Sequence, residues 1–211
     1  RGDTVSVERT SFPKPFSDSI APYEEQIVNR KLNELLLKYV AKTDFVVNVK
    51  FSLIENSENK NAAPTSSNIK MAINILLDDT VLPTVDTFLK EAVPLAINFD
   101  AERGDSLKII RKRFPERSVD SISPEQRTAL KDYRLKILEA FQTGDYVSGL
   151  EWAEKGLKVA VKRADKIFIL KMKGSLHFLL EEKEEALEMW RHVQRLDPKD
   201  KEVRQMLNNL E

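Results

Sequence analysis

The chain has 211 residues, 41% hydrophobic and 32% charged, which is enough to bury one or two ordinary cores. Lys and Arg number 34, as do Asp and Glu, with 16 of each sign up to residue 115 and 18 of each after it, so the net charge argues against a nucleic-acid or anionic-membrane surface. Cysteine is absent, which excludes disulfides, thiol chemistry and cysteine-type zinc sites and leaves the compartment open.

The sequence has no stretch that approaches the ~20 consecutive apolar residues of a membrane span. It starts at Arg1, so a signal peptide or an anchor would lie upstream. Contact with a membrane is therefore expected only through an upstream segment.

A short phrase occurs twice in the chain, as RGDTVSVERTSFP at residues 1–13 and as RGDSLKIIRKRFP at residues 103–115. Residues 4–9 alternate in a way that predicts a half-buried strand. The repetition implies two copies of one supersecondary unit. Residues 1–19 are then the last strand of a preceding copy and a linker.

Residues 20–115 are predicted to fold in the order helix, strand, strand, helix, strand. A helix is expected from Pro22, followed by alternating strands at 45–53 and 69–77 that pair antiparallel. The polar residues 55–68 between these strands are expected to be mobile or ordered by a neighbour. Pro83 starts a second helix, Pro94 ends or kinks it, and the second Arg-Gly-Asp phrase supplies the third strand.

This order predicts an α+β fold with two helices on one face of a three-stranded sheet. The other face and both sheet edges would then be available for a contact. Within the repeated phrase, Gly104 is expected to adopt an unusual backbone angle and Asp105 to cap nearby amides. The alternative is a bridge to an adjacent subunit, and the candidate interface residues are Arg103, Asp105, Arg111 and Arg113.

Residues 116–123 are expected to be a linker, and residues 124–211 to be all helical. Ser123 and Gln126 form a capping box that marks the first helix start. The helices follow in pairs, with a turn at Gly144 and Asp145 and a stop at Pro198 before a last helix.

The second helix pair resembles a tetratricopeptide repeat. Counted from Ile167, the small, Ala, aromatic and Pro places of that repeat are filled by Gly174, Ala186, Trp190 and Pro198. The first pair, counted from Leu130, fits more loosely. The resemblance implies one good repeat, one degenerate repeat and a capping helix that depend on a neighbouring domain.

In tetratricopeptide proteins the concave face often grips a peptide. The resemblance implies that Lys131, Arg134, Phe168 and Lys171 line that face and that its cations hold an acidic segment. The alternatives are an ordinary solvated helix face or packing against the preceding domain.

The first half resembles the ring-building motif of the flagellar MS-ring protein, which is shared with inner-ring lipoproteins of type III secretion and with sporulation ring proteins. Four segments carry the resemblance: YEEQIVNRKLNELLLKYV (23–40), DFVVNVKFSL (44–53), IKMAINILLDD (69–79) and FLKEAVPLAINFDAERGDSLKIIRKRFP (88–115).

The resemblance implies a non-enzymatic scaffold that forms a homo-oligomeric ring in a flagellar or secretion-like machine. Its helical repeats would bind another protein component. The implied location is the cell envelope, periplasmic and membrane-associated, while the composition leaves the cytoplasm open. A monomeric adaptor that binds a peptide through its helices is the alternative.

No residue pattern predicts catalysis, a cofactor or a metal site. The carboxylates of Asp78 and Asp79 have no nucleophile or base beside them in the sequence and are typical of a strand end. His177 and His192 lack a metal-binding spacing and are expected to pack.

Overall fold

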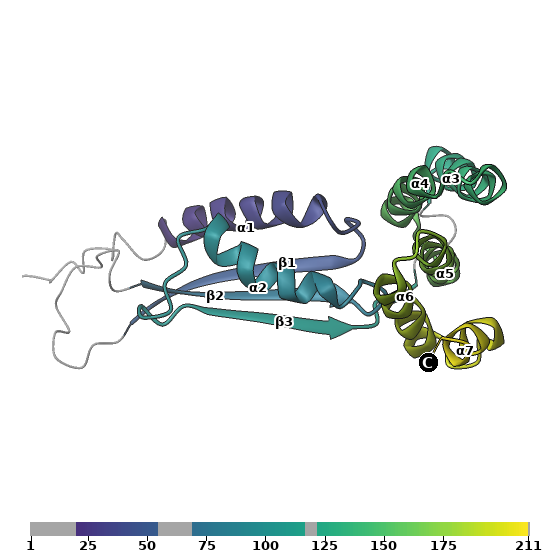
Figure 1. Ribbon diagram of the computed structural model, residues 1–211. Coiled ribbons are helices and arrows are strands. Elements are labelled where there is room, and N and C mark those ends of the chain that lie inside the picture. Colours follow the sequence, from purple (N-terminus) through teal and green to yellow (C-terminus); the bar gives the residue numbers. More distant parts are fainter. Residues whose placement is uncertain (1–19, 55–68, 117–121, 211) are drawn as a thin grey trace, which may run out of the picture.

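The computed structural model describes residues 20–54, 69–116 and 122–210 (Figure 1). The chain is α+β, as predicted. Its first part, here called the sheet module, contains α1 (Ile20–Leu37), β1 (Phe45–Leu53), β2 (Ile69–Asp78), α2 (Thr84–Ala96) and β3 (Ser106–Lys112). The strand expected within residues 4–9 and the polar segment 55–68 lie outside the described residues.

The three strands form one mixed sheet in the order β1-β2-β3. β1 and β2 pair antiparallel, which confirms the prediction, and Val49 lies opposite Ile73. β3 pairs with β2 in parallel, with Ile109 opposite Ile75. A parallel neighbour requires a crossover connection, and α2 provides it.

Both α1 and α2 lie on one side of the sheet (Figure 1). Leu32 and Leu36 of α1 and Leu89 of α2 are fully buried against Ile73 and Ile75 of the central strand. At ~1.5–3 kcal/mol for each fully buried aliphatic side chain, this layer is the main stabilising contact of the sheet module. The opposite side of the sheet has no helix over it in the part of the chain that the structure describes.

The second part, here called the helical module, consists of antiparallel neighbours that each pack on the next. Its elements are α3 (Pro124–Thr143), α4 (Tyr146–Val159), α5 (Arg163–Leu179), α6 (Lys183–Leu196) and α7 (Lys201–Asn208). The predicted capping box is present, since the Gln126 amide donates to Ser123 Oγ and the Ser123 amide donates to Gln126 Oε1, each at 3.2 Å. Gly144 ends α3 with φ of 79°, a left-handed angle that favours glycine.

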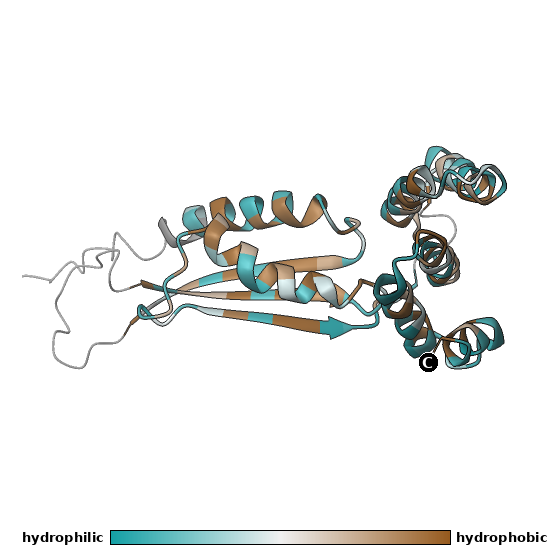
Figure 2. Cartoon of the chain, viewed as in Figure 1, coloured by the Kyte–Doolittle hydropathy of each residue, from teal (hydrophilic) through white to brown (hydrophobic). Residues whose placement is uncertain are grey.

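The helices bury two apolar clusters, one around Ile137, Ala153 and Leu176 and one around Trp190 and Val193. Their hydrophilic residues face outward, and α6 is among the most hydrophilic elements (Figure 2). The helical module lies at the end of the sheet where β3 finishes, with α6 nearest to it (Figure 1).

Candidate functional site

The second Arg-Gly-Asp phrase forms a tight turn that enters β3. Gly104 has φ of 89°, and the backbone then aims the Asp105 carboxylate inward. Asp105 Oδ1 accepts from the Met71 amide at 2.7 Å, and its Oδ2 accepts from the Asp100 amide at 2.9 Å. Arg103 Nη2 lies 2.5 Å from Asp105 Oδ2. The turn therefore ties the start of β3 to the start of β2.

The charges of this turn are partnered inside the chain. Burial on its own would raise the pKa of Asp105, but the Arg103 guanidinium and the two amides outweigh it and lower that pKa. Arg103 also donates to the Asn98 carbonyl at 2.7 Å. Both residues have a local structural role, and their participation in a subunit interface stays a prediction.

Arg111 is also held within the sheet module. Its side chain lies on the helix side of the sheet and forms a two-pronged ion pair with Asp86, at 2.9 Å from Nε and 2.7 Å from Nη2. It also donates to the Val81 and Leu82 carbonyls at 2.5 and 2.8 Å. Arg111 therefore clamps the loop between β2 and α2, whereas Arg113, beyond the end of β3, is exposed.

The uncovered side of the sheet, here called the open face, combines lysines with an apolar row. Its outward positions are Val46, Asn48, Lys50, Ser52, Lys70, Ala72, Asn74, Leu76, Ser106, Lys108, Ile110 and Lys112. Val46, Leu76 and Ile110 are aligned across the three strands, and Val46 and Ile110 are 52% and 44% exposed. Four lysines lie among these positions, and the buried carboxylate of Asp78, opposite Lys112, lies on the same side of the sheet.

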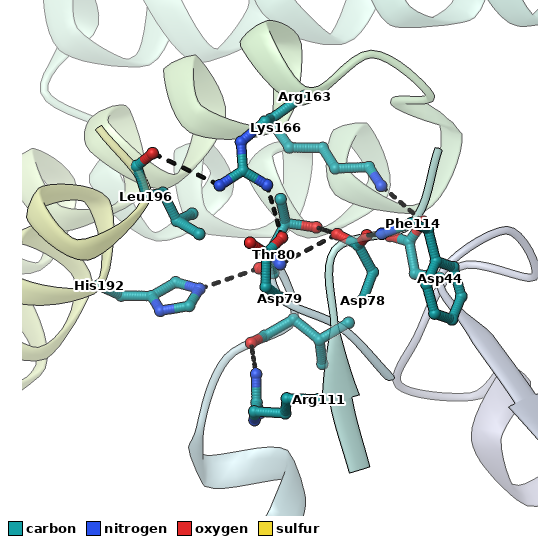
Figure 3. A network of polar contacts seen from close by, with 11 residues as sticks. Asp44, Asp78, Asp79, Thr80, Arg111, Phe114, Arg163, Lys166, His192 and Leu196 are labelled. Atoms are coloured by element: carbon teal, nitrogen blue, oxygen red, sulfur yellow. Dashed lines mark hydrogen bonds and ion pairs between the residues drawn. The ribbon is translucent and has the colours of Figure 1, made fainter. Parts of the chain in front are cut away.

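A buried polar junction joins the two modules (Figure 3). Lys166 of α5 lies 2.5 Å from Asp44, which immediately precedes β1, and both side chains are 8% exposed. Arg163 Nη1 lies 2.5 Å from Asp79 Oδ1. The His192 Nε2 of α6 lies 3.0 Å from the Thr80 carbonyl oxygen. These three contacts, here called the junction, connect α5 and α6 to the strand ends.

The junction holds its titratable groups in defined charge states. Burial raises the pKa of Asp44, and the Lys166 ammonium opposes this effect. Burial also lowers the pKa of His192, so the neutral ring donates from Nε2 to Thr80, and its Nδ1 faces Arg195 at 3.4 Å. A proton on Nδ1 would face that guanidinium, so the junction favours the neutral ring.

Asp78 supports the junction from the sheet side. Its carboxylate accepts from the Thr80 hydroxyl and amide at 2.5 and 3.0 Å and from the Phe114 amide at 2.8 Å. Burial on its own would raise the pKa of Asp78, but these hydrogen bonds lower it. The carboxylates at this strand end are therefore structural groups that fix the exit of β3.

The predicted peptide-binding residues are only partly brought together. Arg134 lies over the Phe168 ring at 4.3 Å and pairs with Asp165 at 3.0 Å. Lys171 is held by α7, with Asp200 at 2.9 Å and Glu202 at 2.6 Å.

Lys131 and Arg134 line a groove of about 430 Å³. Its apolar wall includes Leu130, Leu135 and Leu138. The groove combines this wall with a basic rim, and Phe168 and Lys171 lie outside it.

Sequence reasoning missed the junction. His192 was expected only to pack, and it also hydrogen-bonds to the sheet module. His177 is also expected to pack; its side chain is 13% exposed, and its Nδ1 lies 2.6 Å from Oε2 of the exposed Glu182. The signal that could have indicated the junction was Lys166, a cation at a position where the helix pattern places a buried residue.

Comparison with known proteins does not assign the chain to a class. No protein-family model matches it, and no curated protein is significantly similar to it. None of the helices in the described ranges is both long and apolar enough to cross a membrane.

Proposed function

We propose that this chain is a non-enzymatic structural subunit that assembles with copies of itself into a ring in a cell-envelope machine of the flagellar or secretion type. The sheet module acts as a ring-building motif, and the helical module, a tetratricopeptide-like array, presents a binding surface to another protein component.

The observation that carries this proposal is the open face. Its apolar row of Val46, Leu76 and Ile110 crosses all three strands, while the other side of the same sheet is buried under two helices. Isolated apolar residues are common on protein surfaces, but a sheet face with two unpaired edges invites association. The outer edges of β1 and β3 have no strand beside them among the described residues.

The junction also supports a scaffold. A buried ion pair joins the modules, so the helices hold one orientation relative to the sheet. A subunit that repeats around a ring needs such a fixed geometry, because small angular errors accumulate over successive copies.

The test is mass photometry and negative-stain electron microscopy of the full chain. Ile110→Glu places a charge at the β3 end of the apolar row and should convert assemblies into monomers. Val147→Glu makes a similar change on α4, at a residue that is 61% exposed, and should leave assembly intact. Monomers only, for the unsubstituted chain at micromolar concentration with or without membrane, would defeat the proposal.

A second candidate is a monomeric adaptor that binds an acidic peptide, and the basic-rimmed groove of the helical module favours it. Fluorescence anisotropy with a labelled acidic, leucine-containing peptide tests this function. Lys131→Glu should weaken binding, whereas Lys199→Glu on the exposed end of the chain should not. Equal affinity of both variants would reject the groove as the site.

A further inference from the structure

The chain has no net charge, but its charged side chains are unevenly distributed over the part of the surface that the structure describes. The open face has four exposed lysines, at positions 50, 70, 108 and 112, and the carboxylate on the same side of β2, that of Asp78 opposite Lys112, is buried. A second region has the opposite composition. Residues 181–188, with the sequence EEKEEALE, contain five glutamates and one lysine, and are here called the acidic corner.

The acidic corner is a surface feature of the turn into α6 and of its first two turns. Glu181, Glu182, Glu184 and Glu185 are exposed. Carboxylates in the first turn of a helix are favoured by the helix dipole, which accounts for Glu184 and Glu185. The dipole does not account for Glu181, which precedes the helix. The net formal charge of the corner is therefore −4, against +3 on the open face when the buried Asp78 is counted with the four lysines.

We infer that the open face of one copy receives the acidic corner of the next copy, in a head-to-tail contact. This inference rests on the proposed self-assembly and names the two surfaces that meet. The open face lies on the sheet module and the acidic corner on the helical module, so the two surfaces differ. A contact between different surfaces repeats from copy to copy and closes into a ring when the rotation allows it.

The alternative of stacking the open face on a neighbour's helix layer lacks this complementarity. The exposed charges on α1 and α2 cancel, with Glu24, Glu34 and Glu91 against Arg30, Lys31 and Lys90. A neutral layer offers four lysines no compensating charge. Opposite potentials across a contact accelerate association and fix its register, and similar potentials oppose it.

The junction connects the two surfaces mechanically. Asp44 and Asp78 are the next pair beyond the row of Val46 and Leu76, on the same side of the sheet. Lys166 covers this end, so the open face stops where the helical module begins. The angle between the open face and the acidic corner is therefore set within each copy.

The experiment uses two charge-reversed variants of the full chain, with mass photometry as the readout. The first variant combines Lys50→Glu with Lys108→Glu on the open face. The second combines Glu184→Lys with Glu185→Lys in the acidic corner. Each variant alone removes the net charge of one of the two surfaces and should remain monomeric. In an equimolar mixture, the unaltered open face of the second variant can still receive the unaltered acidic corner of the first. The mixture should therefore form pairs with one copy of each variant, which do not grow further because the remaining two surfaces are nearly neutral.

The control combines Lys199→Glu with Lys201→Glu, two exposed lysines near α7, and alters net charge as the first variant does. It should assemble like the unsubstituted chain. Far-UV circular dichroism and the melting temperature of each variant show whether it is folded. The Glu184→Gln, Glu185→Gln variant, which lowers charge without reversing it, should assemble less than the unsubstituted chain in low salt.

Two outcomes overturn the inference. Undiminished assembly of the folded corner variant would exclude the acidic corner while leaving self-assembly intact. Two folded monomeric variants that fail to assemble when mixed would show that the surfaces do not meet. If the unsubstituted chain itself never assembles, the proposed function fails with the inference. Salt provides a further check, because a rise from about 50 mM to about 500 mM shortens the screening length and should reduce assembly.

Discussion

Replacement of Lys166 by methionine tests the junction. The change keeps most of the apolar stem of the side chain and removes the ammonium that lies 2.5 Å from Asp44. Since both side chains are only 8% exposed, water cannot readily replace the lost partner. The remaining contact to the Asp44 carboxylate that the structure shows is from the Thr43 hydroxyl, at 2.7 Å.

The expected magnitude follows from this burial. Removal of one member of a buried ion pair costs ~3–5 kcal/mol, because the other charge stays buried without compensation. For a chain of this size each kcal/mol lowers the melting temperature by about 2–4 °C, so the variant should melt roughly 6–20 °C lower. The double variant Asp44→Leu, Lys166→Met removes both charges and should recover most of the loss.

Urea unfolding of the four members of this double-mutant cycle provides the assay. Both tryptophans, Trp152 and Trp190, lie in the helical module, so their fluorescence follows that module, while circular dichroism follows the whole chain. Lys199→Met, an exposed lysine, is the matched control and should have little effect.

The penalty should also shrink as the pH falls. Burial already raises the pKa of Asp44, and loss of the lysine raises it further. A carboxyl with a folded pKa above its unfolded pKa gains stability as the pH falls through the folded value. A loss below ~1 kcal/mol, or two single effects that simply add, would mean that the pair behaves as a surface ion pair and would refute the reasoning.

Three further changes have effects set by local geometry. Gly174→Ala should destabilise the helical module by ~1–3 kcal/mol in urea unfolding, because the added Cβ would lie 2.5 Å from Trp190 Nε1. His192→Gln should reduce the loss of stability below pH 6.5, measured as melting temperature against pH. In the unfolded chain, His192 binds a proton near its usual pKa of 6.5, whereas in the folded chain its lowered pKa delays protonation to lower pH. Protonation therefore favours the unfolded state, and the unsubstituted chain loses stability as the pH decreases below 6.5. Asp105→Asn should cost ~1.5–3 kcal/mol through weakened charge-assisted hydrogen bonds, and the Met71 amide should exchange faster with deuterium.

Each of these changes has a result that would contradict it. An alanine at position 174 that raises the melting temperature would mean that helix propensity outweighs the clash. If the melting temperature of the His192→Gln variant depends on pH as in the unsubstituted chain, the His192 imidazole does not cause the loss of stability at acidic pH. Unaltered amide exchange at Met71 would mean that Asp105 does not hold β2, in which case the turn would be tied by Arg103 alone.

The elements of both modules could be predicted because their signals are local. Alternation marked β1 and β2, the Ser123 box marked the start of α3, and Gly144 marked its end. The Arg-Gly-Asp turn was also predictable, since glycine tolerates φ of 89° and aspartate accepts from nearby amides. These features depend on neighbours a few residues apart, which the sequence displays directly.

The contacts of the candidate site are not local, and the sequence could not indicate them in the same way. Lys166 and Asp44 are 122 positions apart, and neither segment contains a sequence pattern that indicates its partner. The sequence makes Arg111 a candidate interface residue. Its partner Asp86 lies in the first turn of α2, and the two residues meet only because α2 crosses over from β2 to β3. Charged residues are compatible with many partners, so their pairing depends on the tertiary structure.

Because the net charge is zero, composition says little about the charged surfaces through which the proposed assembly would form. A uniform mixture of charges and two patches of opposite sign give nearly the same total, but only the second arrangement directs one copy onto another. Patches on a flexible chain could also pair within one copy or at variable angles. The buried Lys166–Asp44 pair restricts this freedom, because it holds the helical module at the end of the open face. In the proposed assembly, a change that loosens the junction would therefore alter ring closure, while a change in either patch would alter the strength of the contact.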